Sequence, residues 1–177
     1  MKETFWLLDV NYEVKDHDPE VWIWGIKEDG KRILVIDRNF LPYFYLEVAE
    51  KEDPQAVMKQ IEAQRADFPL IDRLETVDRR SFGRPVKAIK VTCRDPDLVE
   101  RYSKRLSKIR GVKGSFEDDM RYSMRYLIDN DVTPCGWHEV EAEKTENTWG
   151  VQVDQVFLAE SFPKLSLIHI SEPTRPY

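Results

Sequence analysis

Few side chains in this 177-residue sequence have the types and spacing that catalysis or metal binding requires. Cys93 and Cys135 are too far apart for the paired thiolates of a zinc site, and the three histidines do not cluster with them. The sequence has no glycine-rich phosphate loop and no G-x-S-x-G nucleophile motif. Residues 16–20, DHDPE, put carboxylates beside an imidazole, but a solvated turn between two strands is the expected structure there. We therefore predict no catalytic residue, no metal site and no cofactor in this chain.

Basic side chains gather in the middle of the sequence, although the net charge is −6. Residues 73–113 contain 13 lysines and arginines, whereas acidic residues concentrate in 13–20, 47–53 and 139–146. A basic stretch in an acidic chain is typical of a surface that faces phosphates. It is equally typical of the solvated faces of two strands and a helix, and the sequence leaves both interpretations open.

The elements that would position these residues belong to an ordinary globular chain. Hydrophobic residues make up 41% of the sequence, enough for a core, and no apolar run reaches the length of a membrane span. The N-terminus lacks the pattern of a signal peptide, so we expect a cytoplasmic protein with two reduced thiols and no membrane partner.

The first 40 residues predict an antiparallel meander of strands. Residues 5–12 and 21–26 are rich in aromatic and β-branched residues, and 33–36 is the return strand. Asp29-Gly30 between two apolar runs predicts a two-residue hairpin turn.

The next segment predicts a β-α-β-β-α-β order. Strands are expected at 43–48, 71–77, 86–93 and 112–116, and both helices begin with Asp-Pro, at Asp53 and at Asp95. Gly111 ends the second helix. This order is the ferredoxin-like arrangement. The predicted fold class is therefore α+β, an antiparallel N-terminal strand meander plus a ferredoxin-like βαββαβ unit.

The segment after residue 116 predicts a helix from Asp119 and then two strands, at 137–143 and 151–158. RNA-recognition domains of ferredoxin-like fold carry exposed aromatics on a central strand. The expected central strand at 86–93 has no aromatic residue. Recognition of that kind is therefore not predicted.

Several short stretches, in order and in register, resemble archaeal family B DNA polymerases between about residues 5 and 135. The opening LDVNY (Leu8–Tyr12) is similar to their LDVDY, and DRNFLPYFY (Asp37–Tyr45) is similar to their DRTFxPYFY. FGRP (Phe82–Pro85) resembles their FLG(R/K)P. FEDD (Phe116–Asp119), followed by RYLID (Arg125–Asp129), resembles their (Y/F)E-x-D-(I/V)…RYLID.

The resemblance implies the N-terminal domain, which in this family precedes the 3′–5′ exonuclease and scans single-stranded template for deaminated bases, chiefly uracil. Carried over to this sequence, the base pocket would involve Tyr12, Pro42, Tyr43, Pro85 and Ala88, with the phosphate held by Arg125 and Arg121. Ala88 stands where the family commonly has valine, and Arg121 where hyperthermophilic members have proline. Fixed backbone groups would read the uracil edge, and an apolar wall would exclude the methyl group of thymine.

The resemblance also implies partners and a parent enzyme. The partners would be single-stranded template DNA, the exonuclease and polymerase domains of the same parent chain, and a sliding clamp bound through the parent. The parent would be a DNA-directed DNA polymerase with exonuclease activity, nucleotide binding and Mg²⁺, whereas this chain would lack the catalytic residues.

Each residue of the implied pocket also has a structural interpretation. Tyr43 alternates with Phe44 along a strand, so one of the two packs in a core in any case. Tyr12 could pack on the hairpin, Pro42 could mark the start of a strand, and Arg125 could pair with Asp129 four residues later on a helix.

The C-terminal residues have a different character. LSLIHISEPTR, in 165–177, resembles the translation of a sequencing-library adapter, so we expect an artefactual tail that follows a break before the exonuclease motifs. The expected domains are the template-reading domain at 1–130, a lead-in to the exonuclease at 131–164, and the tail at 165–177. The alternative is a freestanding ferredoxin-like regulatory or interaction module that does not bind nucleic acid.

Overall fold

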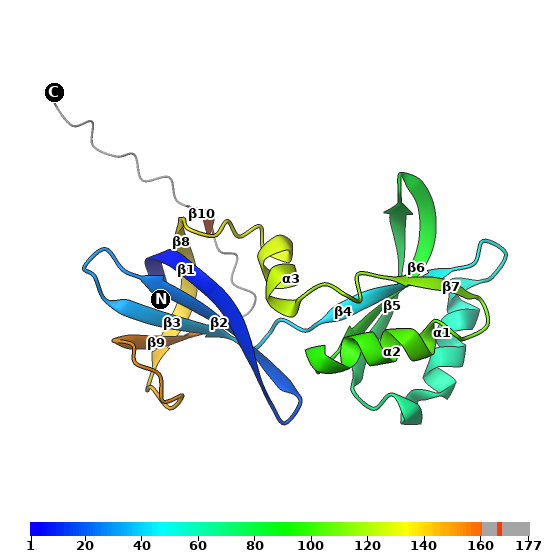
Figure 1. Cartoon of the computed structure of the whole chain (residues 1–177), viewed down its shortest axis with the longest axis horizontal. Coiled ribbons are helices and arrows are strands. Elements are labelled where there is room, and N and C mark those ends of the chain that lie inside the picture. The colour runs from blue at the N-terminus through cyan, green and yellow to red at the C-terminus, as the bar shows by residue number, and fades with distance from the viewer. Residues whose placement is uncertain (161–165, 168–177) are drawn as a thin grey trace. The chain divides into compact units, whose positions relative to one another are not determined.

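A computed structural model of the chain describes residues 1–160 and 166–167 and divides into two compact units (Figure 1). Unit 2 contains Val14–Pro19 and Leu41–Tyr122. Unit 1 contains Met1–Glu13, Glu20–Phe40 and the chain from Ser123 onward. The boundaries predicted at residues 130 and 164 stay predictions.

Unit 2 has the predicted ferredoxin-like order. Its elements are β4 (Tyr43–Val48), α1 (Pro54–Ala63), β5 (Ile71–Ser81), β6 (Arg84–Cys93), α2 (Val99–Leu106) and β7 (Val112–Phe116), with short 3-10 turns at Arg65–Asp67 and Pro96–Leu98. The strands form an antiparallel sheet in the order β5-β6-β4-β7. The α+β class and the βαββαβ unit are confirmed.

The two Asp-Pro signals begin helical structure as predicted. The side chain of Asp53 accepts a hydrogen bond from the backbone N–H of Gln55, and Asp95 caps the turn that leads into α2 by accepting one from Asp97. Gly111, at φ 92°, lies in the turn after α2, where a left-handed backbone favours glycine.

The sheet of unit 2 has one face covered by helices and one face without them (Figure 1). Alternate side chains of β4 and β6 point to the helices and form a core with α1 and α2; they include Phe44, Leu46, Val48, Ile89, Val91 and Cys93. Because side chains alternate along a strand, the intervening residues lie on the other face. We call this other face the open face: Tyr43, Tyr45 and Glu47 of β4, and Ala88, Lys90 and Thr92 of β6.

Unit 1 is a closed barrel rather than a meander with a separate strand pair. It contains β1 (Lys2–Lys15), β2 (Asp18–Ile26), β3 (Arg32–Asp37), β8 (Trp137–Thr145) and β9 (Gln155–Ala159), and α3 (Tyr122–Asp129) precedes β8. The order is β1-β2-β3-β9-β8, and β8 pairs with β1 to close the ring. The antiparallel meander of β1, β2 and β3 is confirmed. With β3 parallel to β9, the strand order is that of an OB-fold barrel.

The turn between β2 and β3 differs from the prediction. Lys27 and Lys31 close a three-residue loop in which the N–H of Lys27 donates to the carbonyl of Lys31, and only Gly30 has positive φ. This is a type I turn followed by a glycine bulge, because Asp29 does not adopt the left-handed conformation that a two-residue turn would need.

The described part of the tail is small. Ser166–Leu167 forms β10, which pairs with β8 opposite Glu139 and His138. The rest of the predicted artefactual tail at 165–177 lies outside the described residues. Among the described residues, no helix is long and apolar enough to cross a membrane.

Candidate functional site

The open face of unit 2 carries paired aromatic and cationic side chains. The Lys90 ammonium lies 3.9 Å from the centroid of the Tyr43 ring, and the Arg79 guanidinium lies 4.9 Å from that of Tyr45. The rings of Tyr43 and Tyr45 meet edge to face, with centroids 5.5 Å apart. Antiparallel pairing positions the residues of both strands, because Tyr45 lies directly opposite Lys90.

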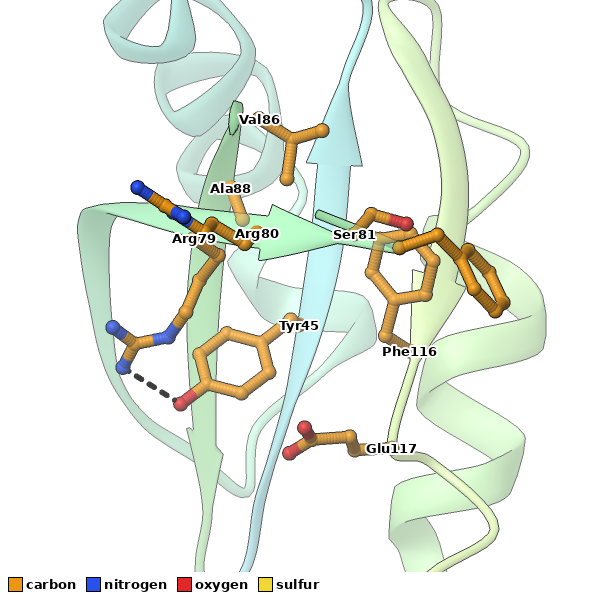
Figure 2. Close-up of a pocket in the computed structure, with 9 residues that line it drawn as sticks. Tyr45, Arg79, Arg80, Ser81, Val86, Ala88, Phe116 and Glu117 are labelled. Atoms are coloured by element: carbon orange, nitrogen blue, oxygen red, sulfur yellow. Dashed lines mark hydrogen bonds between the residues drawn. The ribbon is translucent and has the colours of Figure 1, made fainter. Parts of the chain in front are cut away.

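A pocket of about 280 Å³ opens beside this row, at the small end of the range for small-molecule sites. It is lined by Tyr45, Arg79, Arg80, Ser81, Phe82, Val86, Ala88, Phe116 and Glu117 (Figure 2). Apolar walls thus surround a space that is edged by the guanidinium of Arg79, the hydroxyl of Ser81 and the carboxylate of Glu117. Such a pocket suits a flat, polar-edged ligand such as a nucleobase.

Arg79 is held in place by Tyr45. Its guanidinium donates to the phenolic oxygen of Tyr45 at 2.9 Å, as the dashed line in Figure 2 shows. The hydrogen bond to Tyr45 raises the pKa of Arg79 above its ordinary value, so the charge is permanent. A fixed cation at the pocket edge can hold a phosphate without reorganising.

The implied site residues in unit 2 lie at different points along the sheet. Pro42 and Tyr43 lie at one end, since the carbonyl of Pro42 accepts from the N–H of Cys93. Ala88 lies farther along the open face, opposite Glu47, and lines the pocket. Pro85 is exposed on the far part of β6. Among these residues, Ala88 is the one that the structure places in the pocket.

The remaining implied residues lie elsewhere. Arg121 is exposed and directly precedes α3, whereas Tyr12 of β1 is partly buried. Arg125 of α3 is 4% exposed, so most of its side chain is enclosed within the protein. Tyr12 and Arg125 belong to unit 1, and Arg121 belongs to unit 2.

Sequence reasoning named Ala88 and missed the other eight residues that line the pocket: Tyr45, Arg79, Arg80, Ser81, Phe82, Val86, Phe116 and Glu117. The alternation in YFYLEV was a usable signal, because it puts Tyr45 on the same face as Tyr43. The central strand β6 has no aromatic residue, but β4 is the other central strand and supplies both tyrosines. Arg79 and Phe116 come from the edge strands, and only strand order brings them together.

The described residues contain no group of three or more His, Cys, Asp or Glu that could hold a metal ion. Burial raises the pKa of the Cys93 thiol to about 12, so this group is not a ready nucleophile.

No family model matches the chain. The "DNA polymerase 3" of Saccharolobus shibatae is 34% identical to it over 146 residues, which are 82% of this chain and 18% of that protein. The "DNA polymerase 2" of Aeropyrum pernix is 32% identical over 159 residues, 87% of this chain and 19% of that protein.

A solved structure agrees with these relatives. The family B DNA polymerase of the hyperthermophilic archaeon Pyrobaculum calidifontis matches with a TM-score of 0.78 and 30% identity, covering 98% of this chain and 21% of that one. The chain belongs to the archaeal family B DNA polymerases. It spans about a fifth of the length of these relatives, consistent with their N-terminal domain.

Proposed function

We propose that this chain is a template-reading domain that binds single-stranded DNA for a family B DNA polymerase. The observation that carries the proposal is the open face, where Tyr43 and Tyr45 lie beside Lys90 and Arg79 next to a base-sized pocket. Aromatic rings stack on unpaired bases and cations follow the phosphates, which is how proteins hold single strands. The family relationship supports DNA as the ligand.

The finer proposal is that the domain senses uracil ahead of synthesis. The pocket offers an apolar wall at Val86 and Ala88, which could exclude the methyl group of thymine, and polar groups at Arg79 and Glu117 for a base edge. The resemblance adds Tyr12, Pro42, Tyr43 and Pro85 as proposed contacts of the base, and Arg121 and Arg125 as proposed contacts of the phosphate. A paired base hides its edge, so sensing requires a single strand.

The proposal extends to a parent enzyme. The parent would add nucleotides to a primer, proofread with an exonuclease domain, bind a sliding clamp and act in the cytoplasm. Mg²⁺ would support that chemistry when bound by carboxylates in the catalytic domains of the parent. The described residues of this chain contain no group of carboxylates that could hold a metal ion.

Equilibrium binding to labelled oligonucleotides tests the proposal. Three single strands that differ at one central base, uracil, thymine or cytosine, would be titrated with the chain at several salt concentrations and followed by fluorescence anisotropy. We expect binding that weakens as salt rises and is tightest for uracil. Salt-dependent binding without a preference for uracil would support the template-binding proposal and contradict the uracil-sensing proposal.

Arg79→Gln is the matched test of the open face, with Arg73→Gln as its control. Both arginines are exposed on β5, but Arg73 pairs with Glu75 and lies outside the pocket. We expect the first change to weaken binding several-fold and the second to have little effect. Absence of binding by the unaltered chain would favour a freestanding interaction module.

A further inference from the structure

The ends of β5 and β6 form a two-stranded arm that extends past the rest of the sheet (Figure 1). Strand β4 pairs with β6 only as far as Ala88, whereas Asp78 to Ser81 of β5 pair with Lys87 to Arg84 of β6 alone. We call residues 78–87 the hairpin arm. Its two strands support each other without a third strand, so both of their outer edges are accessible.

The tip of the arm presents an aromatic ring to solvent. Phe82 has a relative exposure of 102%, the highest among the exposed large hydrophobic residues. Phe82 and Gly83 have φ values of 48° and 81°. Positive φ at both central residues defines a tight hairpin turn that matches the twist of the strands. For phenylalanine this conformation is uncommon, so the ring is presented at a conformational cost that core packing does not offset.

The arm is positively charged in an acidic protein. Residues 78–87 contain four basic residues and one acidic residue, Asp78, while the whole chain has a net charge of −6. Among the described residues, Arg80, Arg84 and Lys87 have no ion-pair partner, whereas arginines near the other end of the same strands pair with acidic residues. These three cations are therefore available to a polyanion.

We infer that the hairpin arm is a second contact for single-stranded nucleic acid, in which Phe82 stacks on an unpaired base and Arg80, Arg84 and Lys87 hold the neighbouring phosphates. An exposed ring can stack on a flat partner, and unpaired cations on the same short ribbon attract negative charge. A single strand supplies both, because its bases expose their faces. A duplex offers phosphates but keeps its base faces stacked.

This inference rests on the proposed function, because it assumes that unit 2 binds a single strand. It adds contacts beyond the pocket, because Phe82 and Arg80 line the pocket edge, whereas Arg84 and Lys87 of the arm lie outside its lining. The DNA strand would then be held at two points, by Phe82 at the tip and by Tyr43 and Arg79 of unit 2.

The test compares Phe82→Ala and Phe82→Tyr with Ile128→Ala, a change of another exposed hydrophobic residue, which lies in α3. Thermal melting first checks that each full-length variant is folded. Binding to a short thymidine oligonucleotide is then measured by fluorescence anisotropy. We expect about a tenfold loss of affinity for Phe82→Ala. We expect near-original affinity for Phe82→Tyr and Ile128→Ala, since tyrosine keeps the ring.

A series of oligonucleotides, each with one abasic position, identifies the base that stacks on Phe82. The unaltered chain should lose affinity when the base opposite Phe82 is missing, and Phe82→Ala should show no further loss at that position. The combined change Arg80→Gln, Arg84→Gln and Lys87→Gln should make the salt dependence shallower by about 2 in log K per log salt.

The outcomes separate the two proposals. If the unaltered chain binds and Phe82→Ala binds equally well, the arm is not a stacking site, and template binding by the open face stands. If Phe82→Ala weakens duplex and single-strand binding to the same degree, base stacking is again excluded. If the unaltered chain binds no single strand, template binding fails, and the inference fails with it.

Discussion

The roles of Arg79 and Tyr45 in the pocket can be tested separately, because one side chain is exposed and the other is buried. The Arg79 guanidinium makes a cation–π contact with the ring of Tyr45 and donates a hydrogen bond to its hydroxyl. Tyr45 is itself buried, so in the proposed complex it would act on a bound DNA strand mainly by fixing Arg79.

Tyr45→Phe therefore tests positioning at the pocket. The ring stays, but the hydroxyl that accepts from Arg79 is lost, and we expect a few-fold weaker binding of single-stranded DNA. The double variant with Arg79→Gln should bind no more weakly than Arg79→Gln alone. Additive losses in this double-mutant cycle would show that the two residues act independently.

Arg125 supplies a second residue-scale prediction. If it holds phosphate, Arg125→Ala should weaken the binding of uracil-containing strands more than Cys135→Ala, a change at an exposed free thiol. Because Arg125 is buried, melting curves must accompany the binding data. Equal effects of the two changes in folded variants would contradict the role of Arg125.

Asp37 is a buried carboxyl in unit 1 that makes the stability of the protein depend on pH. Burial raises the pKa of Asp37 above 3.8, although its oxygens accept hydrogen bonds from the N–H of Asn39 and the hydroxyl of Tyr126. A raised carboxyl pKa means that the folded state holds its proton longer. Stability from this group is thus fully present below the unfolded pKa and is lost as pH rises through the folded pKa.

Asp37→Asn should remove that loss, because an amide keeps an acceptor and cannot ionise. We expect the variant to be more stable than the unaltered chain at neutral pH and to lose this advantage near pH 4. Thermal melting across that range measures the effect, with Asp131→Asn, at an exposed carboxylate of the same unit, as the control. A constant difference at every pH would argue against burial as the cause.

At the scale of elements, the turn after α2 depends on a glycine for two reasons. Gly111 has φ 92°, and a Cβ there would lie 2.8 Å from the Cγ2 of Val57 in α1. Gly111→Ala should therefore lower the free energy of unfolding by about 2 kcal/mol, through backbone strain and crowding.

Gly114→Ala is the matched control, since a Cβ at Gly114 meets no atom within 4 Å and its φ is not positive. Urea unfolding of the two variants gives the comparison. Similar free energies for both would show that the turn adapts at little cost.

The sequence predicts elements better where contacts are local. The Asp53-Pro54 and Asp95-Pro96 signals located helical structure because a cap is a contact between near neighbours. Closure of the barrel was not predictable in this way, because the parallel partner of β3 is β9, more than 100 residues later. The pocket depends on strand order for the same reason. Ala88 was named only through the family resemblance, and Phe116, on the edge strand β7, was missed.

At the scale of the whole molecule, the two units differ in how many segments of the chain they contain. Apart from the short segment Val14–Pro19, unit 2 is continuous from Leu41 to Tyr122, whereas unit 1 is assembled from separate segments. Unit 2 has its own core of residues from β4, β6, α1 and α2. A fragment of residues 41–122 should therefore fold alone, although it lacks His17 and its contact with Asp95.

A fragment of residues 1–40 should not fold, because β1 and β3 then lack the partners β8 and β9. Circular dichroism and hydrogen exchange of the two fragments measure this contrast. Cooperative melting of 1–40, or a disordered 41–122, would contradict it.

The separation of β3 from β9 also sets an order of events during translation. About 120 residues lie between the end of β3 and the start of β9, which at roughly 5–20 residues per second takes about 6 to 24 seconds to synthesise. The ferredoxin-like unit emerges within that interval and can complete its own sheet. The strands made first are thus enclosed last, and a ribosome that pauses within residues 41–122 would leave their apolar faces without a partner.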